Sequence, residues 1–363
     1  MVLDRRTAYH ALPLATLGLA VLLEFGILYA RDAALPLRVV LTVMAIGLVF
    51  ATVFAALYHA EIIAHRIGEP FGTLVLTFAV TSIEVSVIVA VMLHGSDNPE
   101  VARESIFSTC MMILAGVVGI CLTVGGLRHR HQDLKRQGTN AYLAVLTALA
   151  VLTLVLPNYT LAANAAAQFG LVGLLCILLY GSFVYAQTGL HREDFVEDLI
   201  EPESRREIVR TKSIAINVFL LLVGLVGVVL LAEDIAAGIE GALHAVNAVQ
   251  TDAIVGAFIA TMVLMPEAVS AIRASMANQL QRSLNIALGS ACATIGLTVP
   301  AVTAVSLWTG KELTLGLGAG DTVLLLLAIG VSTLSFGTGR TTYLTGLVHL
   351  VVFVAYFFLI FFP

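Results

Sequence analysis

The sequence carries little charge and no familiar catalytic motif. Only 12% of its 363 residues are Asp, Glu, Lys or Arg, and the formal net charge is −5. That balance argues against a nucleic-acid partner, which would require a basic surface. The chain has no GxSxG or HExxH motif and no GxxxxGK[ST] phosphate loop. The sequence therefore predicts neither an enzyme nor a nucleotide-driven pump, and it predicts no cofactor.

Cysteine is also scarce. The four cysteines are scattered through apolar segments, with no CxxC pair and no spacing typical of a metal site; they are Cys110, Cys121, Cys176 and Cys292. We expect them to be small core residues, not a disulfide framework or a zinc site.

Apolar residues dominate the composition. Hydrophobic residues make up 59% of the chain, and the mean hydropathy is +0.98. These values are typical of a polytopic α-helical membrane protein. The apolar runs predict an all-α polytopic membrane protein with about 11 transmembrane helices. The expected spans are 10–30, 36–63, 70–94, 105–127, 140–156, 164–187, 213–234, 251–275, 284–308, 320–337 and 341–362.

The distribution of Lys and Arg predicts the orientation in the membrane. With the N-terminus in the cytoplasm and the spans alternating, 15 of the 19 Lys and Arg residues fall in cytoplasmic segments. The other four are Arg31, Arg38, Arg103 and Lys311. We therefore expect a multi-pass protein of the inner (plasma) membrane, with a cytoplasmic N-terminus and an outer C-terminus.

Two expected spans carry a glutamate near their middle. Glu84 lies about half-way along the third span, with the hydroxyls of Thr81 and Ser82 within one helical turn. An ionised carboxylate at that depth costs roughly 2.5–3.5 kcal/mol. Glu267 has an equivalent place in the eighth span, directly after Pro266, which predicts a broken or kinked helix. For one such glutamate alone, a protonated side chain hydrogen-bonded between helices is the alternative.

The two glutamates belong to an internal repeat. The matching pairs are separated by 172, 183 and 182 residues, and they are Glu61 with Glu233, Glu84 with Glu267, and Ser108 with Ser290. Spans two to six therefore match spans seven to eleven. Because each half has five helices, an odd number, the two halves must cross the membrane in opposite directions.

The repeat predicts how the chain is divided. Residues 1–35 form a first span outside the repeats, 36–187 form the first inverted repeat, and 213–363 form the second. Residues 188–212 are a charged cytoplasmic linker whose acidic residues recur every three or four positions. A solvated connector is one interpretation of this linker, and a cation collector or regulatory element is the other.

An inverted repeat places its substrate site near the midplane, between the halves. Glu84 and Glu267 would then face each other and form a site of hard oxygen ligands, which suits Ca2+, Na+ or protons. Protons and a cation would compete for the same oxygens, and such competition produces exchange. The expected supporting ligands are Thr81, Ser82, Ser108, Ser270, Asn285 and Ser290. Glu61 and Glu233 are expected to line the inner and outer access paths, or else to be helix-end carboxylates in contact with water.

Four segments resemble the Ca2+/H+ exchanger (CAX) branch of the Ca2+:cation antiporter superfamily, especially its bacterial ChaA-like members. They are 68–73 (GEPFGT), 81–85 (TSIEV), 265–267 (MPE) and 285–290 (NIALGS). The resemblance implies eleven helices, the first of them accessory, and two inverted five-helix halves. It also implies that Glu84 and Glu267 coordinate the cation.

The chain departs from that family pattern at two places. The usual Gly-Asn pair before each glutamate is replaced by Val80-Thr81 and by Val263-Leu264. One amide ligand is thereby absent from each half, which leaves room for Na+ or K+. We expect a secondary antiporter exporting Ca2+, or Na+/K+, against protons. The alternatives are a monovalent Na+(K+)/H+ antiporter with little Ca2+ transport and a passive cation channel.

The expected partners are inorganic cations, protons and the lipid bilayer. A homo-oligomer is an open alternative, and neither nucleic acid nor a nucleotide is expected.

Overall fold

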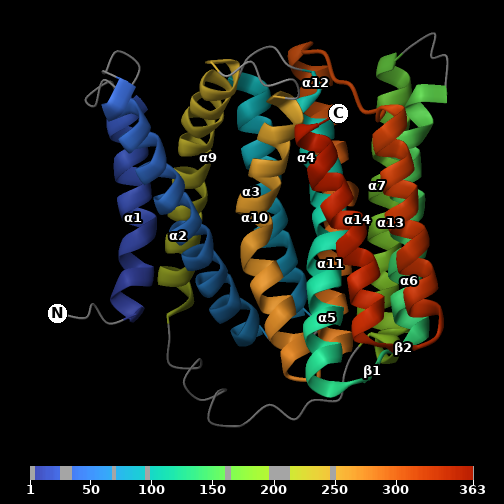
Figure 1. Cartoon of the computed structure of the whole chain (residues 1–363). Coiled ribbons are helices and arrows are strands. Elements are labelled where there is room, and N and C mark those ends of the chain that lie inside the picture. The colour runs from blue at the N-terminus through green and yellow to red at the C-terminus, as the bar shows by residue number, and fades with distance from the viewer. Residues whose placement is uncertain are drawn as a thin grey trace. The chain divides into compact units, whose positions relative to one another are not determined.

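Almost all of the described chain is helical (Figure 1). The computed structural model describes residues 5–24, 35–67, 71–94, 99–159, 165–195, 213–245 and 251–362. Within these residues, ten helices are long and apolar enough to cross a membrane, and a shorter apolar segment runs from Thr77 to Leu93. The prediction of an all-α polytopic membrane protein is confirmed. The four cysteines are buried and free, as expected of core residues.

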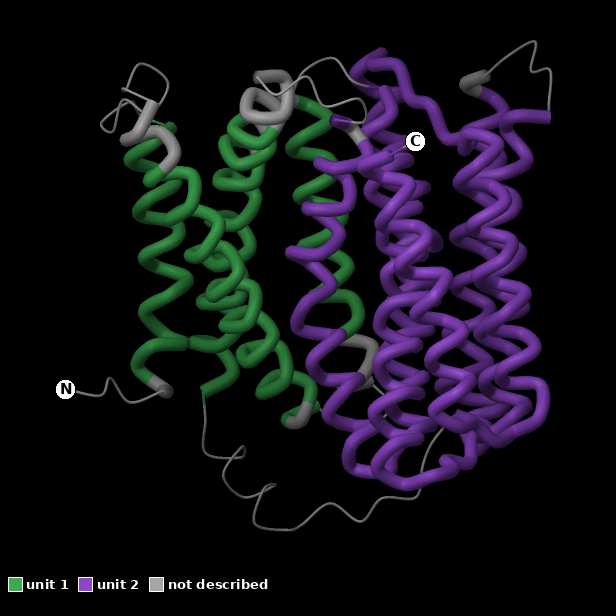
Figure 2. The backbone as a smooth tube through the Cα atoms, in the orientation of Figure 1, with its two compact units in different colours: residues 1–97, 200–247 green, residues 98–199, 248–363 purple. Residues whose placement is uncertain are grey.

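The helices pack into two units, coloured separately in Figure 2. Unit 1 comprises Met1–Asp97 and Ile200–Asn247, and unit 2 comprises Asn98–Leu199 and Ala248–Pro363. Each unit contains helices from both predicted repeats. The boundaries between the two packed units therefore differ from the boundaries between the two sequence repeats.

The described residues of unit 1 form four helices. They are α1 (Arg5–Glu24), α2 (Leu35–Ile67), α3 (Phe71–His94) and α9 (Ile214–Ala245). Helix α9 packs against the other three. Helices α2 and α9 have 33 and 32 residues, well above the roughly 20 that cross a bilayer core. Helix α9 thus continues about three turns beyond the expected end of its span.

One buried histidine links three helices of unit 1. His59 on α2 is fully buried, with Nδ1 2.8 Å from Asn217 Oδ1 on α9 and Nε2 3.1 Å from the Tyr9 carbonyl on α1. The Asn217 amide nitrogen donates to the Ser213 carbonyl at 2.6 Å, which leaves the amide oxygen facing the histidine. A neutral imidazole has one N–H and can donate to only one of these acceptors, whereas the protonated ring donates to both.

Unit 2 contains two long helices of the same construction, each α-helical at both ends with a π-helical turn between. One is α4 (Val101–Met111), η1 (Met112–Val117) and α5 (Val118–His129); the other is α11 (Leu280–Ala293), η6 (Thr294–Thr298) and α12 (Val299–Thr309). The two π-helical turns begin 182 residues apart, the spacing that separates Ser108 from Ser290. The repeat detected in the sequence therefore recurs in the backbone geometry.

The remaining elements of unit 2 surround these two helices. They are β1 (Gln132–Asp133), α6 (Arg136–Ala150), η2 (Val151–Val155), η3 (Leu156–Tyr159), α7 (Ala165–Tyr185), η4 (Ala186–Leu190), η5 (Arg192–Asp194), α10 (Thr251–Met276), α13 (Ala319–Gly337), β2 (Arg340–Thr341) and α14 (Tyr343–Phe361). Helix α14 packs on η1 and α5, while α7 packs on η6 and α12. The last helix of each predicted half thus lies against the π-containing helix of the other half. The short strands β1 and β2 pair antiparallel.

Two local expectations need correction. Helix α10 runs unbroken from Thr251 to Met276 through Pro266, so of the two expected alternatives the broken helix is absent and the kinked helix stays a prediction. A proline removes one N–H and crowds one carbonyl, and packing of α10 against α4 and α11 outweighs that loss. The fourth span begins at Val101 instead of 105, which brings Glu104 inside the helix.

Close packing of α14 on α5 depends on glycine at Gly346. A Cβ at this position would overlap the backbone nitrogen of Thr123 and lie 2.8 Å from the Gly119 carbonyl oxygen. We expect Gly346→Ala to destabilise the protein by about 1–3 kcal/mol through overpacking, as measured by the thermal unfolding midpoint in detergent. Gly330→Ala on α13 is the matched control, since a Cβ there meets nothing within 4 Å. Equal unfolding midpoints for the two variants would contradict this account of the contact.

Candidate functional site

Two of the predicted ligands, both in unit 2, contact each other. Glu267 lies on α10 and is partly buried, and the Ser290 hydroxyl on α11 donates a hydrogen bond to its Oε2. Ser290 is buried, and helices α10 and α11 pack side by side. Ser290 is therefore placed to orient the Glu267 carboxylate. Its own oxygen is also a hard ligand of the kind that Ca2+ and Na+ prefer.

Irregular backbone surrounds this pair. The π-helical turn η6 begins four residues after Ser290, and such turns occur frequently at functional sites. Tyr180 of α7 interacts electrostatically with Glu267. Its close approach to η6 requires glycine, because a Cβ on Gly296 would lie 2.7 Å from the Tyr180 Cβ. In addition, Pro266 supplies no amide proton for the Met262 carbonyl four residues earlier. The Glu267 carboxylate and the Ser290 hydroxyl thus lie next to an irregular turn, with Tyr180 in electrostatic range.

Glu84 lies in the other unit. It is on α3 and is 5% exposed, and its neighbour Thr81 is also buried. The Ser82 hydroxyl donates to the Phe78 carbonyl of the same helix at 2.7 Å. Because Glu84 belongs to unit 1 and Glu267 to unit 2, the pairing of the two glutamates stays a prediction.

Two predicted supporting serines make other contacts. The Ser108 hydroxyl on α4 accepts a hydrogen bond from the Tyr356 hydroxyl on α14 at 2.8 Å. The Ser270 hydroxyl on α10 donates to the Pro266 carbonyl at 2.9 Å, one turn earlier on the same helix. Of the repeat-related serines, Ser290 contacts a glutamate and Ser108 contacts a tyrosine.

Asn285 lies about one and a half turns before Ser290 on α11. Its amide nitrogen donates to the Phe195 carbonyl, and its oxygen accepts from the Gln281 amide at 2.8 Å. Phe195 is itself buried and contacts the ring of Tyr142, with centroids 5.4 Å apart. In this structure Asn285 therefore anchors the start of the linker. Residues 196–212, most of the acidic linker, lie outside the described residues.

The predicted access-path acids lie on the two long helices of unit 1. Glu61 is on α2 and is partly buried. Glu233 is on α9, and its side chain lies outside the described part of the structure. Their role in access stays a prediction.

Sequence analysis missed a charged network at the start of α4. Arg103 bonds to Glu104 Oε1 at 2.7 Å, to Glu100 Oε2 at 2.7 Å and to the Gly316 carbonyl at 3.0 Å. Glu104 is 6% exposed, and Asp321 at the start of α13 interacts electrostatically with both Arg103 and Glu104. One arginine thus holds a buried carboxylate near the helix end that is predicted to face outward.

One sequence feature could have indicated this network: Glu104 stands one residue before the expected start of the fourth span. Charged residues at a boundary are usually assigned to the loop, and here the helix begins four residues earlier. Sequence spacing also gave no sign of the contacts from Gly316 and Asp321, which come from more than 200 residues away.

The family assignment rests on a comparison of the whole chain with known proteins. The model of the sodium/calcium exchanger protein family matches residues 37–189 and 216–362. The chain belongs to this family. This family consists of transporters, not enzymes. The exchanger therefore acts on cations in a lipid bilayer. Its membrane-spanning helices and its similarity to a bacterial antiporter are consistent with a place in the inner membrane.

Relatives and solved structures agree with that assignment. The exchanger is 34% identical over 339 residues to the sodium-potassium/proton antiporter ChaA of Escherichia coli, covering 92% of each chain. It is 43% identical to y4hA of Sinorhizobium fredii, covering 90% of each. Its fold resembles native YfkE with a TM-score of 0.69 at 16% identity, covering 98% of this chain and 100% of that one. It also resembles the H+/Ca2+ exchanger CAX with a TM-score of 0.63 at 14% identity, covering 94% and 86%.

The Arg103 network predicts a large loss of stability when the arginine is removed. Arg103→Gln would leave the buried Glu104 carboxylate without its charge partner, which costs about 3–5 kcal/mol. The measurement is chemical unfolding in detergent micelles. Arg340→Gln is the control, because Arg340 and Asp133 are 60% and 83% exposed in their ion pair and such pairs contribute about 1 kcal/mol or less. Similar losses for both variants would show that the network does not stabilise the fold.

Proposed function

We propose that this exchanger is a secondary antiporter that exports Ca2+, or Na+ and K+, in return for entering protons. The observation that carries the proposal is the 34% identity, over 92% of both chains, to an E. coli protein named as a sodium-potassium/proton antiporter. The proposed binding groups are Glu84, which is buried, and Glu267, which is partly buried, reached alternately from the two sides of the membrane.

The chemistry of the proposed site accounts for exchange. A carboxylate within apolar helices is costly while charged, and either a proton or a cation can neutralise it. Because both ligands use the same Glu267 oxygens, binding of one displaces the other. The Ser290 hydroxyl can donate to the carboxylate and also present its oxygen lone pairs to a cation. Protein motion between two access states then couples the two fluxes.

The proposed alternating access rests on two inverted halves. The family model matches in two separate stretches, 37–189 and 216–362, and the π-helical turns of unit 2 recur at the spacing of the repeat. Both observations support halves of common origin, which is the architecture of many alternating-access transporters.

The second candidate is a monovalent antiporter that moves Na+ or K+ with little Ca2+. Its support is the replacement of the family's Gly-Asn pairs by Val80-Thr81 and Val263-Leu264, since Ca2+ usually takes 6–8 oxygen ligands and each half lacks one amide. A passive cation channel is the third, and it would move cations without proton coupling.

Flux across everted vesicles or proteoliposomes tests the proposal. With an imposed pH gradient, addition of the transported cation (Ca2+, Na+ or K+) should dissipate the gradient in the wild type. Glu84→Gln and Glu267→Gln should reduce this exchange to background, because an amide cannot carry the charge that cation and proton share. Glu312→Gln, which removes an exposed carboxylate, is the control and should exchange normally.

Two results of that assay would overturn the proposal. Normal exchange in either site variant would remove that glutamate from the site. Cation flux in the wild type without any change in the pH gradient would instead establish the channel.

Two expected ligand serines, Ser290 on α11 and Ser270 on α10, give a finer test. Ser290→Ala removes the hydroxyl that bonds the carboxylate, and we expect the Michaelis constant for the cation to rise about fivefold, the equivalent of one hydrogen bond of roughly 1 kcal/mol. Ser270→Ala is the matched comparison, because the hydroxyl contact of this second expected ligand is with the Pro266 carbonyl of its own helix and not with Glu267. A larger effect in Ser270→Ala than in Ser290→Ala would contradict the proposed ligand.

A further inference from the structure

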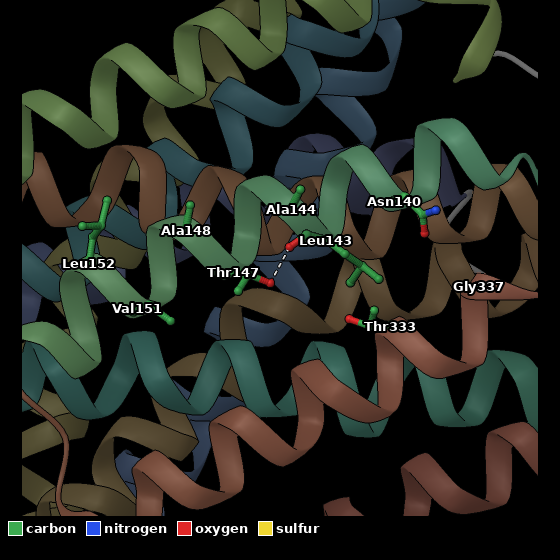
Figure 3. Close-up of a pocket in the computed structure, with 9 residues that line it drawn as sticks. All are labelled: Asn140, Leu143, Ala144, Thr147, Ala148, Val151, Leu152, Thr333 and Gly337. Atoms are coloured by element: carbon green, nitrogen blue, oxygen red, sulfur yellow. Dashed lines mark hydrogen bonds between the residues drawn. The ribbon is translucent and has the colours of Figure 1, made fainter.

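A groove with a volume of about 750 Å³ runs between α6 and α13 in unit 2 (Figure 3). Both helices belong to segments that are long and apolar enough to cross the membrane, Arg136–Tyr159 and Ala319–Gly337. The residues that line the groove are Asn140, Leu143, Ala144, Thr147 and Ala148 on α6, Val151 and Leu152 on η2, and Thr333 and Gly337 on α13. The groove is thus lined mainly by apolar side chains within two membrane-spanning segments.

The walls of the groove are apolar despite their hydroxyls. Thr147 donates to the Leu143 carbonyl at 2.6 Å, and Thr333 donates to the Ile329 carbonyl at 2.9 Å. Both hydroxyls are therefore satisfied within their own helices, as Figure 3 shows for Thr147. Ala144 and Thr333 are exposed, so the groove is open at these two residues. Such a surface suits a hydrocarbon chain, which needs no hydrogen bonds.

One end of the groove is basic. Asn140 and Gly337 lie at this end (Figure 3). Arg136 is four residues before Asn140 and shares its face of α6, and its Cδ lies 2.8 Å from where a Cβ on Gly339 would be. Arg340 follows three residues after Gly337, with Nε 3.3 Å from a largely exposed Asp133 carboxylate. Arg136 and Arg340 therefore lie in sequence next to this end of the groove, with Arg340 in an exposed ion pair with Asp133, on the side that the distribution of Lys and Arg predicts to be cytoplasmic.

We propose that this groove binds one acyl chain of an anionic phospholipid from the cytoplasmic leaflet, with the lipid phosphate against Arg136 and Arg340. The groove matches the two parts of such a lipid. Its apolar walls suit the acyl chain, and Arg136 and Arg340 near one end suit the charged headgroup. A second copy of this chain could cover the apolar walls, but a helix contact would make no use of the two arginines. The charge at the mouth therefore favours the lipid.

Native mass spectrometry of the full-length, delipidated protein tests the site. Phosphatidylglycerol and phosphatidylcholine with identical acyl chains are added in parallel, and bound lipid is counted. We expect a preference for phosphatidylglycerol. In the double variant Arg136→Gln/Arg340→Gln this preference should fall about 25-fold, since each basic residue near a membrane surface contributes about a fivefold preference. Ala148→Phe, which fills the groove, should abolish binding of both lipids at this site.

Matched controls keep the test decisive. Arg282→Gln removes another exposed arginine away from the groove, and Val323→Phe enlarges an exposed side chain on α13 outside it; both should bind phosphatidylglycerol like the wild type. If Ala148→Phe fails to fold, Ala144→Leu is the milder filling variant. Equal binding of the two lipids, or unchanged binding in the double variant, would overturn the proposal. So would a disulfide-linked dimer formed efficiently by Thr333→Cys in lipid vesicles, because it would place a second copy in the groove.

Discussion

A charged carboxylate among apolar helices costs free energy unless a partner stabilises it. Unit 2 shows two kinds of partner. Glu104 is held by the guanidinium of Arg103, a fixed cation that neutralises it permanently. Glu267 instead accepts a hydrogen bond from the neutral hydroxyl of Ser290. A hydroxyl can orient a carboxylate and also present its own oxygen to a cation. Glu104 thus belongs to a charged network that joins distant segments, whereas exchange at Glu267 is the role proposed above.

Helix irregularity is the second recurring feature. The π-helical turns η1 and η6 each begin one turn after a repeat-related serine. A π-helical turn shifts the hydrogen-bond register and changes which side chains and carbonyls face a neighbouring helix. In η1 the Leu114 carbonyl accepts from the buried His349 of α14 at 2.6 Å, while in η6 the glycine at Gly296 admits Tyr180. The two π-helical turns thus make different side-chain contacts in the two halves. The halves share the position of this turn more than they share the residues around it.

Much of the fold could be predicted because the bilayer imposes simple rules. Span lengths follow from membrane thickness, and most expected spans agree with the helices to within a few residues. The wrong predictions concern positions where the local sequence pattern favours one structure and packing against other helices favours another. Pro266 was expected to break or kink α10, and the helix is continuous through it because neighbouring helices pack against it. Glu104 was left outside its helix, because a carboxylate next to an apolar run resembles a loop residue until Arg103 and Asp321 are seen beside it.

The sequence alone determined the class of protein, the positions of the membrane-spanning segments and the spacing of the repeat, because hydropathy and periodicity are local properties. It also singled out Glu267 and Ser290, since a polar residue inside an apolar span is conspicuous. Only the tertiary structure decided which hydroxyl contacts which group: Ser290 bonds Glu267, whereas Ser270 bonds its own helix and Asn285 holds Phe195. These partners come from residues up to 90 positions apart, and nothing in local spacing encodes the packing that brings them together.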